Sequence, residues 1–311
     1  MTSPSTDDTT LLTEIANLEH HLQALKAQLH HPPPSSSPSH SSSFVSTPSS
    51  DLHSILLISD SALPLGSFAY SAGLESFLAH TPKPLHTLPS TFRQFLDLSL
   101  YSLASTSLPY VRAVHVNPKS LQDRDDEYDA SVTCTVARRA SVGQGKALVG
   151  VWEKSLKVAY GSSGDYEACT ALEEFARCLK SAPPGASGRG GKAEFGQEVL
   201  VVHGHLAPLF GCLARALKIP LPHALYVYFL NHAKTLLSAG IRASLLGPYQ
   251  AQGILAGEKL RDRMWALVRE ELEVKLEAVE EEGLERVGQS VPVLDLWAGR
   301  HEIVYSRIFN S

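Results

Sequence analysis

The chain has 311 residues, 43% of them hydrophobic, which is enough to bury a substantial core in one or two domains. Lys and Arg total 27 against 32 Asp and Glu, so a net charge of -5 offers no basic surface for nucleic acid or an anionic membrane. The four cysteines form no Cys-x-x-Cys pair, the first residues lack the basic start and apolar core typical of a secretory signal, and no apolar run reaches about 18 residues. We therefore expect a cytoplasmic protein that binds no nucleic acid and no membrane.

The N-terminal arm consists of two segments. Within residues 1–30, apolar residues recur at alternating steps of four and three, at Leu11, Ile15, Leu18, Leu22, Leu25 and Leu29. This spacing predicts a short amphipathic helix that either forms a coiled coil or orders only on a partner, because the heptads are few. Residues 31–50 are rich in Pro and Ser and predict a disordered linker, since they have too little apolar surface to offset the entropy of ordering.

Residues 51–311 are predicted to form a single all-α bundle. Apolar residues from Leu88 to Leu103 have helical spacing, and Ser90 and Thr91 are candidate caps. The acidic stretch near 117–130 and the Gly/Pro-rich stretch near 181–193 are predicted to be surface loops inserted in this domain. No segment combines alternating polarity with β-branched residues and turn signals, so no strand is expected.

Three further helices are predicted in the C-terminal third. The stretch from Pro222 to Leu246 is apolar on most of its circumference, which is typical of a central helix. Gly247 and Pro248 end it, and a new helix is expected to continue into the Glu-rich residues 269–282. A closing helix is expected to start at Pro292 and to place its apolar residues on one face as far as Ile308.

Two segments resemble enzyme motifs but lack residues that the corresponding chemistry requires. Residues 143–146 read GQGK, but a phosphate-binding loop needs Gly where this chain has Ala140 and a hydroxyl where it has Ala147. A helix whose small residues allow close packing is the better interpretation. Four serines, Ser59, Ser61, Ser67 and Ser71, cluster near Asp60, yet no Gly-x-Ser-x-Gly turn or partner histidine accompanies them. We therefore expect no catalytic residues.

A metal site is the third hypothesis. His203, His205 and Cys212 offer the imidazole and thiolate ligands that nickel and zinc favour. On a helix the two histidines would point about 200° apart, so they can share an ion only where the backbone is not helical. Packing within the fold is the preferred interpretation, and we expect no tightly bound cofactor.

Four segments resemble the urease accessory protein F family. Residues 57–75, LISDSALPLGSFAYSAGLE, are similar to its signature, in which Pro64 and Gly66 would form a turn, Ser67 a helix cap and Gly73 a site of close approach. Residues 138–148 and 204–253 are similar to its helices, and residues 300–311, RHEIVYSRIFNS, to its C-terminus. The chain departs from many bacterial relatives at Tyr70, where they often have His, and in its N-terminal arm and loop insertions.

The resemblance implies a non-catalytic adaptor that acts in nickel insertion into urease. It would bind an accessory subunit of the D or H type and through it a GTPase of the G type, modulate that GTPase, and serve apo-urease as a homodimer within the complex. Nickel would be handled by the complex. The residues implied in partner binding are Phe68, Tyr70, Glu75, Arg300, His301, Tyr305, Arg307 and Phe309. The alternative is a metallochaperone that carries nickel itself through His203, His205 and Cys212.

Overall fold

The computed structural model describes residues 50–80, 88–181, 202–274, 287–305 and 307–310, together with Glu19 and Gln23. The chain divides into two units, 1–47 and 48–311. The predicted N-terminal helix and linker lie outside the described residues except for Glu19 and Gln23, which are helical and exposed, and Ser50, which is the first residue of α2 (Ser50–Ser59) and not part of a linker. In the described part of 48–311 every regular element is a helix, which confirms the all-α prediction. None of these helices is long and apolar enough to cross a membrane.

The first half of the larger unit contains three longer helices, α4, α7 and α9, and several shorter ones. In chain order they are α2 (Ser50–Ser59), η1 (Ser67–Ala69), α3 (Leu74–His80), α4 (Leu88–Thr106), α5 (Leu108–Val116), η3 (Pro118–Ser120), α6 (Leu121–Ser131), α7 (Thr135–Val151), the π-helical turn η4 (Trp152–Leu156), α8 (Lys157–Tyr160) and α9 (Tyr166–Ser181). The helix predicted from the spacing of Leu88 to Leu103 is therefore confirmed as α4.

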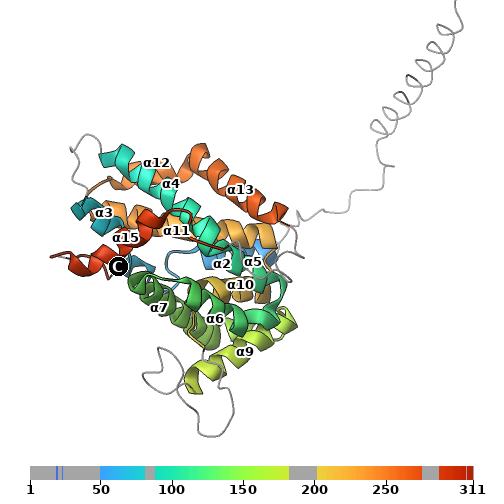
Figure 1. Ribbon diagram of the computed structural model, residues 1–311. Helices are drawn as coiled ribbons and strands as arrows, with labels where there is room; N and C mark the ends of the chain where they lie inside the picture. Colours follow the sequence, from blue (N-terminus) through green and yellow to red (C-terminus); the bar gives the residue numbers. More distant parts are fainter. Residues whose placement is uncertain are drawn as a thin grey trace, which may run out of the picture. The chain divides into compact units, whose positions relative to one another are not determined.

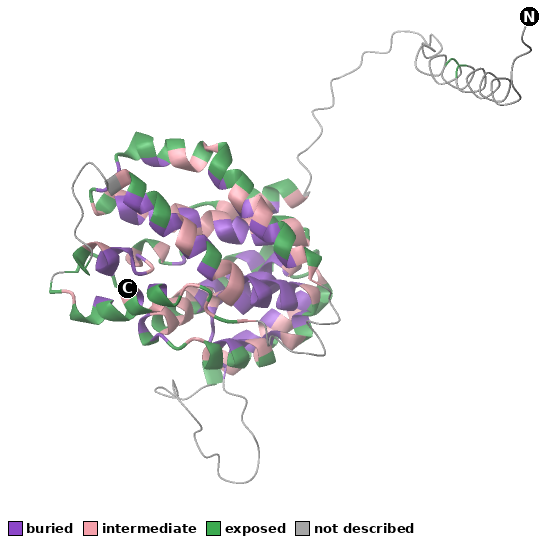
Figure 2. Ribbon diagram, turned by 45° about the horizontal axis from the view of Figure 1, so that its top comes forward, coloured by how far each residue is buried: buried purple, intermediate pink, exposed green. Residues whose placement is uncertain are grey.

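The second half provides the central helices. They are α10 (Leu206–Ala216), α11 (Leu221–Arg242), α12 (Pro248–Ala256), α13 (Glu258–Glu273), α15 (Pro292–Arg300) and η5 (His301–Ile303). Helix α10 packs against α5, α7 and α9, while α11 contacts α2, α4, α5 and α13 (Figure 1). Buried residues line the inward faces of these helices, and exposed residues concentrate on the outer ones (Figure 2). The predicted central helix is thus confirmed as α11, but it ends at Arg242 and not at the Gly247-Pro248 pair.

Glycines allow the helices around α10 to approach each other closely. A Cβ atom on Gly211 of α10 would lie 2.2 Å from the carbonyl oxygen of Val111 in α5. A Cβ atom on Gly145 of α7 would lie 2.1 Å from the carbonyl oxygen of Gly204. Backbone atoms occupy both places, so neither position can hold a larger residue without moving a neighbouring segment. The interpretation of residues 143–146 as part of a closely packed helix is confirmed.

The predicted loop near 117–130 is wrong. Residues 118–120 form η3 and residues 121–131 form α6. The carboxylate of Asp125 is fully buried and accepts the backbone N–H groups of His203 (2.6 Å), Gly204 (3.0 Å) and His205 (2.7 Å). The acidic composition therefore does not mark a solvated loop, because this carboxylate satisfies three buried amide donors.

Several helix ends also differ from the prediction. Helix α4 begins at Leu88, so Ser90 and Thr91 lie inside its first turn and not at its cap. The helix expected after Pro248 is two helices that meet at Gly257, and α13 ends at Glu273. The closing helix starts at Pro292 as predicted but ends at Arg300. Of the loop predicted near 181–193, only Ser181 is described, and it is the last residue of α9.

Candidate functional site

The turn before α3 contacts the C-terminal part of the chain. Gly66 has a left-handed φ of 71°, which agrees with the predicted turn. Ser67 does not cap a helix, because it lies in η1 and its hydroxyl donates to Oε1 of Gln144 on α7 (3.0 Å). A Cβ atom on Gly73 would lie 3.2 Å from the amide nitrogen of Ala298, so the predicted close approach at Gly73 is confirmed and the approaching element is α15.

A buried group that we call the C-terminal clamp, consisting of Glu75, His301 and Phe309, holds the end of the chain. The Glu75 carboxylate accepts the backbone N–H groups of Ile308 (2.6 Å) and Phe309 (3.2 Å). The His301 ring lies beside it, with Nε2 3.1 Å from the Phe309 carbonyl oxygen and Nδ1 3.6 Å from Glu75 Oε2. All three residues are buried. The clamp therefore joins the first turn of α3 to the last residues of the chain.

Two further contacts support the clamp. The guanidinium carbon of Arg242, at the end of α11, lies 4.2 Å from the centre of the Phe309 ring. The Asn310 N–H donates to the carbonyl oxygen of Ala69 at 2.7 Å. Glu75 lies in the first turn of α3, where the helix dipole favours a carboxylate. The sequence indicated no role for Arg242, because an aromatic partner 67 positions away leaves no local pattern.

Between His301 and Phe309 the described residues are exposed, except for Val304, which is partly buried. We call residues 302–305, 307 and 308 the C-terminal loop. Three of its apolar side chains face outward: Ile303 is 71% exposed, Ile308 is 64% exposed and Tyr305 is fully exposed. Glu302 bonds to Arg139 of α7 (2.7 Å) and lies 3.4 Å from Arg307, and the hydrogen bond from Arg139 lowers the pKa of the Glu302 carboxyl. The loop thus presents apolar and basic groups together.

The structure separates the residues predicted to bind a partner into two sets. Glu75, His301 and Phe309 form the buried clamp, whereas Phe68, Arg300, Tyr305 and Arg307 are exposed. Tyr70 is partly buried at the wall of a cavity. The family resemblance implied all eight together because its two segments, residues 57–75 and 300–311, each contain both buried and exposed residues. Partner contact stays a prediction, now carried by the exposed set.

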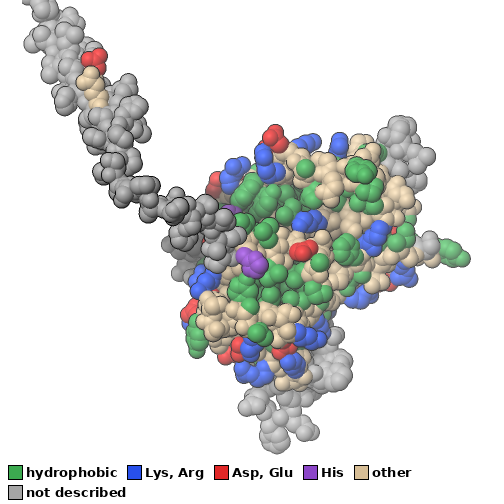
Figure 3. Space-filling model, turned by 180° about the vertical axis from the view of Figure 1, so that it is seen from behind, with side chains coloured by type: hydrophobic (Ala, Val, Ile, Leu, Met, Phe, Trp, Pro, Cys, Tyr) green, Lys and Arg blue, Asp and Glu red, His purple; other side chains and the backbone are tan. Residues whose placement is uncertain are grey.

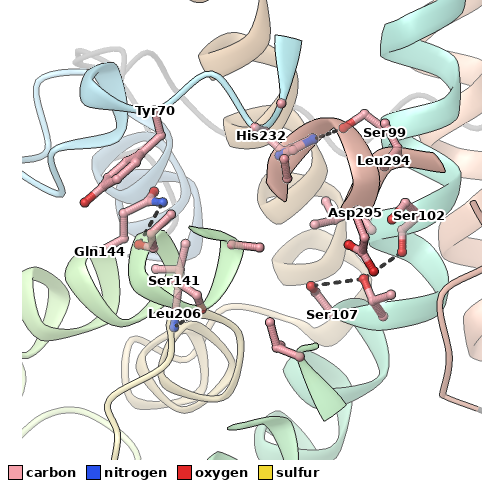
Figure 4. Close-up of a pocket in the computed structure, with 18 of the residues that line it drawn as sticks. Tyr70, Ser99, Ser102, Ser107, Ser141, Gln144, Leu206, His232, Leu294 and Asp295 are labelled. Carbon is pink, nitrogen blue, oxygen red and sulfur yellow. Dashed lines mark hydrogen bonds between the residues drawn. The ribbon is translucent and has the colours of Figure 1, made fainter. Parts of the chain in front are cut away.

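A cavity of about 370 Å³ lies between α4, α7, α11 and α15. Figure 4 shows Tyr70, Ser141 and Gln144 on one side and Ser99, Ser102, His232 and Asp295 on the other. Ser99 Oγ is 2.7 Å from His232 Nε2, and the described residues place no carboxylate in contact with that ring. Gln289 joins Ser102 to Asp295, accepting from the former (2.7 Å) and donating to the latter (3.1 Å). The Ser99–His232 pair therefore lacks the third group of a catalytic triad.

Burial of His232 makes the free energy of unfolding depend on pH. Loss of hydration lowers the pKa of His232 to about 4, below the 6.5 of a free imidazole. The unfolded chain therefore binds a proton that the folded chain excludes between pH 6.5 and pH 4. We expect His232→Gln to lose less stability than the unmodified protein over this interval, by up to about 1.4 kcal/mol per pH unit in urea unfolding.

Two comparisons make the His232 experiment specific. Burial also lowers the pKa of His115 and His205, but both are present in each protein and cancel in the difference. His53→Gln, at an exposed position in α2, is the control and should follow the unmodified protein. Parallel pH profiles for the His232 variant and the unmodified protein would contradict the account.

The histidines of the metal hypothesis lie in a non-helical segment, at residues 202–205. His203 Nδ1 and His205 Nε2 are 3.3 Å and 2.9 Å from the same oxygen of Asp129. Cys212 is fully buried in α10, its thiol contacts the carbonyl oxygen of Ala168, and burial raises the thiol pKa. Within the described ranges no three His, Cys, Asp or Glu side chains are arranged to hold a metal ion. This geometry gives the nickel-carrying alternative no support.

These features define an all-helical protein that presents an apolar C-terminal loop on a buried clamp. The UreF family model matches residues 87–257. The chain is 34% identical to an uncharacterized urease accessory protein UreF-like of Schizosaccharomyces pombe, over 84% of this chain and 97% of that protein. It is 25% identical to urease accessory protein 6 of Cryptococcus neoformans (84% and 97% covered) and 26% identical to urease accessory protein F of rice, Oryza sativa (80% and 81% covered). The chain belongs to the UreF family of urease accessory proteins.

Proposed function

We propose that this protein is a non-catalytic adaptor in the maturation of urease. It binds an accessory subunit of the D or H type and through that complex positions a G-type GTPase, so that nickel is delivered to apo-urease in the cytoplasm. The names of its relatives, urease accessory proteins of fungi and plants, support the accessory role. The C-terminal loop is the observation that supports binding of a partner. Nickel would be held by the complex and not tightly by this chain.

The composition of the C-terminal loop suits a protein interface. Tyr and Arg are enriched among the residues that dominate binding energy, and exposed apolar side chains that lie together mark interaction sites. Ile303, Tyr305 and Ile308 supply apolar surface, while Arg307 can hold a carboxylate bidentately. Phe68 on η1 is 51% exposed and adds to the predicted surface. We infer a partner surface with an apolar pocket and carboxylates near its rim.

Tyr305→Ser tests this interface. Because Tyr305 makes few contacts within the chain, the variant should fold normally and bind the D/H-type subunit about 30-fold more weakly, as for a loss of about 2 kcal/mol at an interface hot spot. Isothermal titration calorimetry measures the change. Tyr166→Ser is the matched control, since Tyr166 is also an exposed tyrosine, 82% accessible on α9. Equal affinities of the two variants would refute the loop as the interface.

We also propose that the adaptor works as a homodimer and modulates the GTPase by positioning it. Hydrophobic side chains gather on the face of the molecule shown in Figure 3, and such a surface supports association with a second copy. Leu52 and Leu56, on the outer side of α2, are large exposed apolar residues that also favour self-association. For the GTPase, Arg300 and Arg307 are exposed and therefore accessible to a partner.

A further inference from the structure

The cavity between α4, α7, α11 and α15 has room for a small molecule. Its volume of about 370 Å³ lies within the range of ligand-binding pockets, roughly 300–1,000 Å³. Residues 287–289 form one wall, which is fixed to α4: the Gly288 N–H donates to the Ser105 carbonyl oxygen (3.3 Å), and the Ser105 hydroxyl donates to Ser290 (2.8 Å). Ser131 and Thr133, where α6 leads into α7, line the cavity and are exposed. The cavity is therefore accessible from solution at this junction.

The charge that faces the cavity is negative. Among the described residues that line it, Asp295 is the one carboxylate and none is a Lys or Arg. Asp295 is partly buried and accepts from the Gln289 amide at 3.1 Å, but within the described ranges it has no ion-pair partner. A cavity lined by charge of one sign concentrates ions of the opposite sign. The cavity therefore disfavours anions and favours a positively charged solute.

His232 offers this cavity a polar group with free hydrogen-bonding capacity. The residue lies deep in the fold, yet it stays partly accessible because it lines the cavity (Figure 4). Its Nε2 contacts Ser99 Oγ, whereas Nδ1 has no hydrogen-bond partner in the part of the chain that the structure describes. Since burial lowers the pKa of His232 to about 4, the ring is neutral at pH 7 and does not repel a cation. Its Nδ1 can bond to a hydroxyl group of a ligand.

Hydroxyl groups and aromatic rings form much of the remaining wall. Six serines and three threonines are among the described lining residues, and hydroxyls can both donate and accept. Burial raises the pKa of Tyr128 and of Tyr228, so both phenols stay protonated and add no negative charge. The faces of such rings attract cations. The wall thus suits a ligand that has a positive charge and several hydroxyl groups.

We propose that this cavity binds a small organic cation, a primary ammonium compound that also has hydroxyl groups, with Asp295 as its counter-ion. The ammonium group bonds to the Asp295 carboxylate, and the ligand hydroxyls bond to His232 and to the Ser and Thr side chains. A metal ion fits less well, because no three His, Cys, Asp or Glu side chains of the described residues are arranged to hold one. The proposal goes beyond the adaptor role and does not depend on it, since the site lies within one chain.

Two small molecules of similar shape separate charge from size. Tris, which at pH 7 is a primary ammonium ion with hydroxymethyl groups, is the probe. Pentaerythritol, in which a further hydroxymethyl group replaces the ammonium, is its uncharged analogue. Titration of the full chain in phosphate buffer is followed by NMR of the methyl groups of Leu103, Val287 and Leu294, which line the cavity. We expect Tris to shift these methyl signals saturably and pentaerythritol to bind roughly 10- to 100-fold more weakly, because it lacks the charged contact.

Asp295→Asn tests the counter-ion. The Asn amide oxygen can still accept from Gln289, so the variant keeps the shape and the internal hydrogen bond while it removes the charge. We expect it to bind Tris roughly 10- to 100-fold more weakly and pentaerythritol as before. Asp123→Asn, at an exposed position on α6, is the matched control and should bind Tris as the unmodified protein does. Circular dichroism shows whether both variants are folded.

Four results would overturn the proposal. Equal affinities for Tris and pentaerythritol would indicate a site for uncharged polyols, and an absence of saturable shifts with Tris would indicate a cavity that holds water only. Zn²⁺ that displaces Tris and shifts the same methyl signals at lower concentration would identify a metal site. Unchanged Tris affinity in a folded Asp295→Asn variant would remove the counter-ion. The first three results come from the unmodified protein, so the proposal can be decided even if the variant does not fold.

Discussion

We expect Asp125→Ala to lower the free energy of unfolding by about 3–5 kcal/mol, as measured by urea denaturation. The carboxylate is fully buried and accepts three consecutive backbone N–H groups, those of His203, Gly204 and His205. Alanine would leave these buried donors without an acceptor. The segment 202–205 precedes the central helix α10, so the loss affects the core and not only a surface turn.

The neighbouring Asp126 is the control for Asp125. Its side chain is 69% exposed, and its nearest basic contact is His203 Nε2 at 3.3 Å. We expect Asp126→Ala to change stability by no more than about 1 kcal/mol, as is usual for exposed ion pairs. Similar losses for the two alanine variants would show that burial and backbone bonding at Asp125 do not have the importance assigned to them.

We expect Gly211→Ala to destabilise the protein by about 2–3 kcal/mol although it adds only one methyl group. The new Cβ would lie 2.2 Å from the Val111 carbonyl oxygen, which is far inside van der Waals contact. That oxygen belongs to the backbone of α5 and cannot rotate away, so α5 and α10 must separate. Thermal or urea unfolding gives the difference directly.

Gly150→Ala makes the Gly211 experiment decisive because the opposite sign is expected. Gly150 is also helical, in α7, and a Cβ atom there would meet nothing within 4 Å. Alanine should stabilise this position by about 0.5–1 kcal/mol through its higher helix propensity. A gain in stability for Gly211→Ala as well would contradict the close packing of α5 and α10.

The sequence predicted the all-helical class and the helices α4 and α11, because apolar periodicity records burial. Helix α4 follows from the spacing of Leu88 to Leu103, and α11 from an apolar stretch whose few polar groups have specific partners. In α11, Asn231 donates to the carbonyl oxygen of Ile58 and Lys234 to that of Ser59, at the end of α2. Gly73 was also predictable, because a glycine after a turn often marks a close approach.

The incorrect predictions concern residues whose hydrogen-bond partners are distant in the sequence. The acidic stretch that contains Asp125 was predicted to be a loop, since no local signal shows that its carboxylate binds amides 78 to 80 positions away. The closing helix ends at Arg300 for a similar reason: Glu75 and Ala69 capture the backbone of residues 308–310. A helix continuing to Ile308 would have satisfied the same apolar pattern. The sequence alone could not decide between these bonding partners.

The residues of the candidate site were predicted together, but their division into a buried clamp and an exposed loop was not predicted. Spacing cannot show that His301 and Phe309 turn inward while Tyr305 between them turns outward, because that division depends on the clamp. The histidine pair is a related case. The backbone at His203 and His205 is not helical, which was the condition for a shared ion, but both rings contact a carboxylate oxygen of Asp129.

The most direct test of the account is urease activity and nickel content in cells that lack this protein. We expect inactive urease with little nickel, restored by the full chain and by Tyr166→Ser but not by Tyr305→Ser. Active, nickel-loaded urease in the absence of the protein would contradict the central claim that this helical adaptor is needed for urease maturation.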